Sequence, residues 1–269
     1  MAITTRDQLA AALAGSYDRP FFKGSATAVS GFIYALFRAS GGDPAASTLA
    51  NPTTTGRALD RTSSGAIPLC ATGSGNTLYL AGLQVAGPTI GNVGIYDRAV
   101  EWGGLSGTVT TAQSLSAVTL PTRCGDGTGY GIWLEIYTAL GSTASATVTA
   151  SYTNQAGTSG RTATLIGGIP ASIPANRVMQ FALQDGDTGV QSVQSVTSTT
   201  STGTAGNFGV TIRKLIDTVP NATANVGYVK GYAETALAII PSDACLEILV
   251  QASTTSTGTL FGKLSIAQG

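Results

Sequence analysis

The stretch GVQSVQSVTSTTSTGTAGNFGVTI, residues 189–212, contains no charged residue. Near its start a valine recurs at every third position: Val190, Val193 and Val196. Strands alternate with period two, and helices repeat an apolar face every three to four residues. Because the flanking TSTTST and Gly have poor helix propensity, the stretch predicts a strand. Two interpretations of the spacing stay open. A β-bulge shifts the register midway, or the outer face of the strand packs on another subunit through small hydroxyl side chains.

The rest of the chain from about residue 65 consists of short apolar or alternating segments separated by Gly, Pro, Asn, Asp and Ser clusters. The segment IWLEIYT, residues 132–138, alternates: isoleucines and a leucine share one face, and Trp133, Glu135 and Tyr137 share the other. Many short strands predict an all-β chain, namely an antiparallel β-sandwich of the jelly-roll or immunoglobulin type. The expected strands are 78–85, 93–102, 116–120, 130–138, 146–152, 161–166, 177–184, 190–197, 208–216, 244–252 and 258–266.

The first 64 residues differ from the remainder. Thr5 and Gln8 form a capping-box pattern and Gly15 is a typical C-terminal residue, which together predict a helix over 6–14. We expect 17–25 to be extended or a turn, 31–39 to be a strand, and 40–64 to cross a surface. The predicted domains are therefore an N-terminal helix and arm, 1–64, and a β-sandwich domain, 65–269. The arm either docks on its own sandwich or reaches a neighbour.

The composition indicates a surface built from hydroxyl groups. Charged residues make up 10% of the chain, against about 25% in typical soluble domains, whereas there are 39 Thr, 24 Ser and 35 Gly. Interface cores are depleted in charge. We therefore expect an ordered protein with much of its surface against other copies or partners. The candidate interface residues are Leu9, Leu13, Phe21, Phe22, Val190, Val193 and Val196.

Several function classes are disfavoured by charge and cysteine usage. Fourteen basic and fourteen acidic residues cancel without a basic cluster, so nucleic-acid binding is not expected. We expect neither a membrane span nor a signal peptide, because the apolar runs are short or broken. Cys70, Cys124 and Cys245 are far apart and lack CxxC spacing, which favours buried thiols in a reducing compartment. One disulfide with one remaining thiol is the alternative.

The sequence contains few residues that are suited to catalysis. The chain contains no His, which removes most general-base and triad schemes, and three dispersed cysteines make a poor zinc set. A glycosidase needs only two carboxylates. Of the four glutamates, however, Glu135 and Glu247 lie mid-strand and are expected to face solvent. We therefore predict no catalytic, cofactor-binding or metal-binding residues and do not expect an enzyme.

Two glycine-rich segments could be mistaken for ligand loops. GDTG, residues 186–189, lacks the further oxygen ligands of a calcium loop, so we interpret it as a tight turn. CGDGTGYG, residues 124–131, is followed by a strand and not by a helix that could hold a phosphate, so it is also expected to be a turn. Trp102 and Trp133 could form a sugar-binding platform, but aromatic residues in strands are more often core.

Three segments resemble proteins of tailed bacteriophages. SYTNQAGTSGRTATL (151–165) and GDTGVQSVQSV (186–196) are similar to segments of structural proteins encoded in virion modules, and MAITTRDQLAAALA followed by a strand with FRASG resembles the start of such proteins. The resemblance implies a virion component, best matched by a head decoration or cement protein, which commonly forms trimers.

The implied partners are the major capsid protein and copies of the chain itself, with no nucleic acid and no membrane. The implied location is the outer surface of a capsid assembled in the bacterial cytoplasm. Alternatives are a tail-tube or other virion structural protein, and a host-surface or glycan-binding adhesin module.

Overall fold

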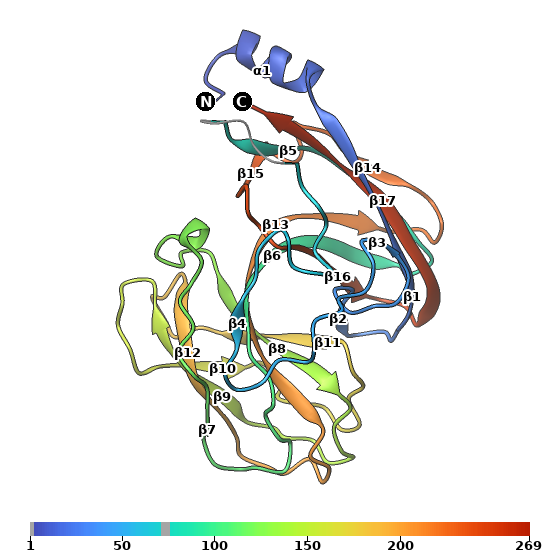
Figure 1. The fold of residues 1–269 in the computed structure, drawn as a ribbon. Coiled ribbons are helices and arrows are strands. Elements are labelled where there is room, and N and C mark those ends of the chain that lie inside the picture. Colours follow the sequence, from blue (N-terminus) through green and yellow to red (C-terminus); the bar gives the residue numbers. More distant parts are fainter. Residues whose placement is uncertain (1–2, 71–75) are drawn as a thin grey trace. The chain divides into compact units, whose positions relative to one another are not determined.

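The computed structural model describes residues 3–70 and 76–269, which form two compact units (Figure 1). Unit 1 comprises Met1–Thr48, Asp60–Asp97 and Leu215–Gly269, and unit 2 comprises Leu49–Leu59 and Arg98–Lys214. This division differs from the expected boundary after residue 64. The reason is long-range strand pairing, because the N-terminal strand pairs with the C-terminal strand and a short piece of the expected arm belongs to unit 2.

Helix α1 (Arg6–Ala14) forms with the predicted bounds. The Thr5 hydroxyl accepts a hydrogen bond from Gln8 N at 3.2 Å, and Gln8 Oε1 accepts one from Thr5 N at 3.1 Å, so the capping box is confirmed. The backbone N–H of Gly15 bonds back to the last turn. Leu9 and Leu13 are half-buried.

Within the described part of unit 1, six strands form one antiparallel sheet in the order β14-β5-β17-β1-β3, with β15 also paired to β5. Strand β1 pairs with β17 from Tyr17 opposite Ile266 to Ala28 opposite Ser256. The segment 17–25, expected to be extended or a turn, is therefore part of a long strand. The bounds are β1 (Tyr17–Ala28), β3 (Gly42–Asp43), β5 (Leu78–Ala86), β14 (Tyr228–Lys230), β15 (Ala238–Ile240) and β17 (Ser256–Gln268).

A second sheet contributes to both units. Its order is β2-β16-β6-β13-β8-β11-β10-β9-β12-β7, and β4 pairs with β6. In unit 1, side chains from β16 and β6 share one core with those of the first sheet, for example Ile248 with Leu80 and Leu264. The strands of this sheet that reach unit 1 are β2 (Ile33–Ala35), β16 (Leu246–Ala252), β6 (Gly91–Glu101) and β13 (Asn207–Asn221), of which β6 and β13 also enter unit 2.

Unit 2 contains the remaining strands, and the all-β prediction is confirmed there as well. One strand prediction is wrong, because residues 116–120 do not form a strand and a short pairing stands at 113–114 instead. In unit 1, the strand predicted at 31–39 is confirmed only for Ile33–Ala35. The elements are β4 (Arg57–Ala58), β7 (Gln113–Ser114), η1 (Thr122–Cys124), β8 (Gly131–Thr138), β9 (Val148–Asn154), β10 (Arg161–Leu165), β11 (Arg177–Ala182) and β12 (Val190–Ser198).

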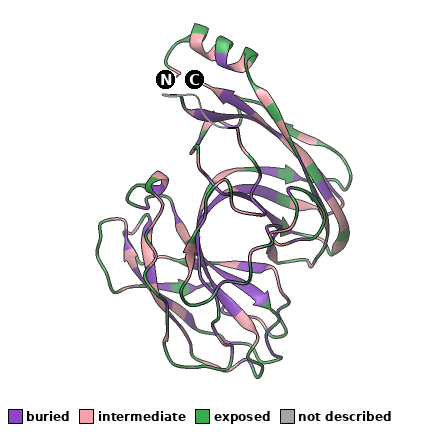
Figure 2. Ribbon diagram, in the orientation of Figure 1, coloured by how far each residue is buried: buried purple, intermediate pink, exposed green. Residues whose placement is uncertain are grey.

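Strand β12 explains the three-residue valine spacing. Its register against β9 shifts between Val190 and Ser192 and again between Val193 and Ser195. Each shift adds one residue to β12, which turns the next valine back to the same side. Val190, Val193 and Val196 are 0%, 1% and 0% exposed, and Figure 2 shows buried positions recurring along the strands of unit 2. The bulge interpretation is confirmed. The valines fill the core of their own chain, so in this conformation their side chains do not line an interaction surface.

Lys23 is an unusual core residue of β1. Its side chain is 1% exposed, and its Nζ donates to the carbonyl oxygen of Ala45 at 3.3 Å. Burial lowers the pKa of Lys23 to about 8, although the charges of Glu247 and Asp43 act in the opposite direction. A charged ammonium without a carboxylate in hydrogen-bonding contact is a cost to the folded state.

This cost predicts that the chain becomes more stable as the pH rises from about 8. Between pH 8 and the unfolded pKa near 10.5 the unfolded chain binds more protons than the folded one, so the free energy of unfolding increases with pH. The expected gain from pH 8 to pH 9.5 is about 1.5 kcal/mol. Above pH 10 the ionisation of Tyr17 opposes this gain. Burial raises the pKa of Tyr17 to about 12 in the folded chain, so the unfolded chain loses this proton first and the free energy of unfolding falls. Urea unfolding followed by circular dichroism measures the gain, and Lys23→Met should abolish it; an equal gain in that variant contradicts the assignment.

Candidate functional site

A buried ionic network lies where β6, β8 and β13 meet in unit 2. Arg98 Nη1 donates to Glu135 Oε2 at 2.7 Å, and Arg98 Nε donates to Glu101 Oε2 at 3.1 Å. Arg213 also donates to Glu135. These four side chains are all 0–1% exposed. The network links three strands through side chains that are far apart in the sequence.

Arg57 extends the network from the segment 49–59 that precedes β5 in the chain. Its Nε donates to Glu101 Oε1 at 2.6 Å, and its Nη2 donates to the carbonyl of Ala50 at 2.5 Å. Three guanidinium groups thus surround two carboxylates. A guanidinium can donate two parallel hydrogen bonds to a carboxylate, and a buried carboxylate requires a partner of this kind. The ion pair holds the one piece of the expected arm that belongs to unit 2, Leu49–Leu59, on the rest of that unit.

The expectation that Glu135 and Glu247 face solvent is wrong, because both are 1% exposed. The alternation along β8 is present, but both of its faces are covered. Trp133 and Tyr137, on the same face as Glu135, are also buried. A central strand with two buried faces needs apolar or paired residues on each.

The network is not built for acid–base chemistry. The carboxylate oxygens of Glu101 and Glu135 point at arginines, and the side chains are closed to solvent, so a substrate does not reach them. The nearby Tyr137 is held protonated, since burial first and the charge of Glu135 second raise the pKa of its hydroxyl well above the usual value. Its hydroxyl donates to the carbonyl of Trp102 at 3.2 Å. The arrangement fixes strands in place.

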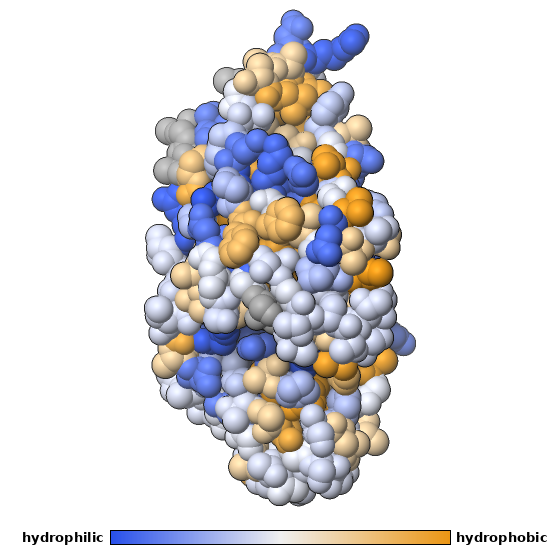
Figure 3. All heavy atoms as spheres, turned by 90° about the vertical axis from the view of Figure 1, so that its right-hand side faces the viewer, coloured by the Kyte–Doolittle hydropathy of each residue, from blue (hydrophilic) through white to orange (hydrophobic). Residues whose placement is uncertain are grey.

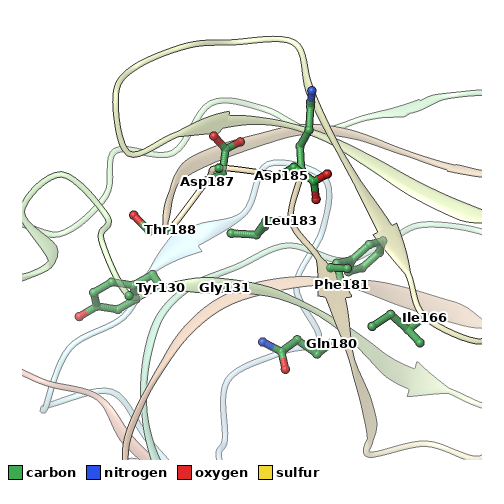
Figure 4. A pocket seen from close by; sticks show the side chains of 13 residues that line it. Tyr130, Gly131, Ile166, Gln180, Phe181, Leu183, Asp185, Asp187 and Thr188 are labelled. Carbon is green, nitrogen blue, oxygen red and sulfur yellow. The ribbon is translucent and has the colours of Figure 1, made fainter.

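A cavity of about 550 Å³ lies in unit 2. Both glycine-rich segments border it and both are turns, as expected (Figure 4). The N–H of Gly129 donates to the carbonyl oxygen of Thr188 at 2.8 Å, and the N–H of Val190 donates to the carbonyl oxygen of Gly127 at 3.2 Å. The two turns therefore lie side by side. The lining residues are 129–131, Ile166 and 180–188.

Asp187 in the GDTG turn is fully used as an internal acceptor. It receives hydrogen bonds from Arg161 Nε at 2.8 Å, Asn154 Nδ2 at 2.7 Å and the hydroxyl of Tyr152 at 2.5 Å. The bond from Arg161 is the main reason that the pKa of Asp187 falls to about 2. Among residues 3–70 and 76–269, no cluster of three or more His, Cys, Asp or Glu side chains could hold a metal ion. The aspartate stabilises the turn.

The aromatic rings at the cavity do not form a stacking platform. Tyr130 and Phe181 are buried, and the exposed lining consists of Ile166, Gln184 and Asp185 among others. Trp102 and Trp133 are buried too, so they are core residues, as interpreted from the sequence. The cavity is an open groove of mixed polarity without a fixed pair of reactive groups.

The remaining sequence candidates fall into two classes. Phe21 is buried in the core of unit 1, whereas its neighbour Phe22 is 49% exposed. All three cysteines are thiols, so the disulfide alternative is not formed; Cys124 and Cys245 are buried as expected, and Cys70 is half-buried. Of the seven candidate interface residues, only Phe22 presents a largely exposed side chain.

Sequence reasoning missed the ionic network. A signal was present: Arg98, Glu101, Glu135 and Arg213 are charged residues inside strongly apolar strands of a chain that has few charges. Charged residues inside such apolar strands are rarely buried unless they form ion pairs. Two acids and two bases in three neighbouring apolar strands are the pattern of such a network.

Comparisons with known proteins give little further information. No protein-family model and no curated protein matches the sequence. Among solved structures, the chain is similar to the infectious bursal disease virus VP2 subviral particle, with 10% sequence identity and a TM-score of 0.19, over 94% of this chain and 80% of that chain. A similarity at this level supports no conclusion. Of the helices that the structure describes, none is long and apolar enough to span a membrane.

Proposed function

We propose that the chain is a structural protein of a tailed-phage virion, acting as a capsid decoration protein that adheres to neighbouring protein surfaces and carries out no catalysis. The proposal rests first on the resemblance of 151–165 and 186–196 to virion structural proteins. It includes a β-sandwich arrangement for unit 1, which is supported by the core that its two sheets share.

The observation that carries the proposal is a surface that is poor in charge and carries large apolar side chains. The chain has only 14 basic and 14 acidic residues, at least eight of these 28 are buried, and large apolar side chains of both units are exposed. Surfaces with few charges and with exposed apolar groups suit protein contacts. The buried charged residues are Lys23, Asp97, Arg98, Glu101, Glu135, Arg177, Arg213 and Glu247. The exposed apolar residues include Phe22, Phe261, Ile166, Val229 and Ile239.

The proposed mechanism is energetic. Each copy bridges neighbouring capsomers and buries surface at the joint, so that the shell resists the pressure of the packaged genome. Individual contacts can be weak, because many copies bind one shell and each bound copy holds its neighbours close to their own sites. Partners are the major capsid protein and further copies of this chain.

We expect purified protein to bind expanded capsids that lack it, up to a fixed number of copies per shell. Sedimentation of capsids with bound protein measures the stoichiometry, and the same protein is offered in parallel to host cells and to a glycan array. Binding to capsids that saturates supports the decoration role. Saturable glycan binding without capsid binding contradicts it and favours the adhesin alternative.

A further inference from the structure

The outer face of the first sheet in unit 1 carries apolar side chains that are large and exposed. Phe22 on β1 lies directly opposite Phe261 on β17, and each is 49% exposed. Val229 on β14 is 64% exposed and lies in the next row, opposite Gln84 of β5. Figure 3 shows apolar atoms gathered among hydrophilic ones on the side of unit 1 where β1 and β17 lie.

The register places these residues on one face. Gln84 is opposite Lys263, and Lys263 is opposite Pro20. Lys263 and Pro20 are two residues from Phe261 and Phe22 along their strands, so their side chains share the same side of the sheet. We call this set the β1–β17 face: Pro20, Phe22, Gln84, Val229, Phe261 and Lys263, with Asp18 and Ser265 in the following row.

One end of this face is covered by a described element of the chain itself. Helix α1 packs there through Ala12 on Ala81 and Ala267. The residues beneath the helix are small, which allows a close approach. Beyond the helix the same face changes to phenylalanine and valine, which are costly to leave in water and are typical of interface cores.

The charges on the β1–β17 face suit a second copy of the same surface. Lys263 Nζ donates to Asp18 at 2.7 Å, and the two side chains remain 41% and 51% exposed. A surface with one exposed charge of each sign beside an apolar centre is complementary to itself under a two-fold axis, because each lysine meets the partner's aspartate. The formal net charge of zero adds no repulsion between copies.

We propose that the β1–β17 face pairs two copies of this chain about a two-fold axis, with Phe22 and Phe261 at the centre and Lys263 exchanging ion pairs with Asp18 of the other copy. The inference rests on the proposed function, in that it names one of the protein surfaces to which the chain adheres. Capsid binding by a protein that stays monomeric would contradict this pairing and leave the decoration role standing.

The test is the mass of the full chain in solution, measured by sedimentation velocity over a range of concentrations. We expect a dimer that Phe22→Glu and Phe261→Glu each weaken roughly thirtyfold or more, as central aromatic residues of an interface do. The matched control is Ile166→Glu, which charges an equally apolar and more exposed side chain in unit 2 and should leave the dimer unchanged. Since all three positions are exposed, thermal unfolding should show each variant folded.

Charge exchange makes the test specific. Lys263→Glu and Asp18→Lys should each weaken the dimer, because each variant opposes like charges, whereas an equal mixture of the two should form a heterodimer. A monomer at all concentrations overturns the proposal, and so does a dimer that the phenylalanine variants leave intact. A trimer overturns the two-fold arrangement.

Discussion

Glu135→Ala is expected to lower the free energy of unfolding of unit 2 by about 3–5 kcal/mol. Glu135 accepts hydrogen bonds from Arg98 and Arg213, and all three side chains are closed to solvent. Removing the carboxylate leaves two guanidinium groups facing each other in the interior. They lose an attractive partner and gain mutual repulsion, and neither can turn to water.

Urea unfolding followed by tryptophan fluorescence measures this loss, because both tryptophans of the chain, Trp102 and Trp133, lie in unit 2. The control is Asp185→Ala, which removes an exposed charge in the same unit and should cost no more than about 1 kcal/mol. Glu135→Gln keeps the shape but not the charge and should fall between the two. A loss for Glu135→Ala no larger than that of the control would show that the network does not stabilise the fold.

Local patterns in the sequence predicted local structure well. The capping box at Thr5 and Gln8 predicted the first residue of α1 and Gly15 predicted the last, because the groups that determine each end lie within one turn of it. The valine repeat of β12 left a bulge as one of two interpretations, and the two register shifts against β9 settled it. In such cases the residues that decide the structure are neighbours in the chain.

Long-range features were outside the reach of those patterns. The pairing of β1 with β17 joins the two ends of the chain and moves the unit boundary away from residue 64. The same limit applies to the sites: the alternation of β8 placed Glu135 on a face correctly, but whether that face meets water depends on β6 and β13. Phe21 and Phe22 are adjacent in the sequence and lie on opposite faces of β1. Phe21 is buried and Phe22 is exposed because the core of unit 1 lies against only one of these faces, and this depends on strands that are distant in the sequence.

Gly209→Ala is expected to destabilise unit 2 by about 3 kcal/mol or more. Gly209 lies in β13 opposite Glu135, and a Cβ atom there would stand 1.9 Å from the carbonyl oxygen of Trp102 and 2.6 Å from Cα of Gly103. Both are backbone atoms, so the clash cannot be relieved by a change of rotamer. The segment that carries them is itself bonded to β13, since Trp102 N donates to the carbonyl of Val210 at 2.8 Å.

The added methyl group must therefore push the chain at Trp102 away from β13, which stretches or breaks backbone hydrogen bonds in a buried region. Gly131→Ala is the matched control: Gly131 lies in β8, the strand paired with β13, and the nearest atom to its Cβ would be Gln180 Nε2 at 3.4 Å. That contact is ordinary and the side chain can move, so a change within about 1 kcal/mol is expected. Equal urea midpoints for the two variants, followed by tryptophan fluorescence, would mean that the Trp102 segment does not approach β13 as closely as the structure places it.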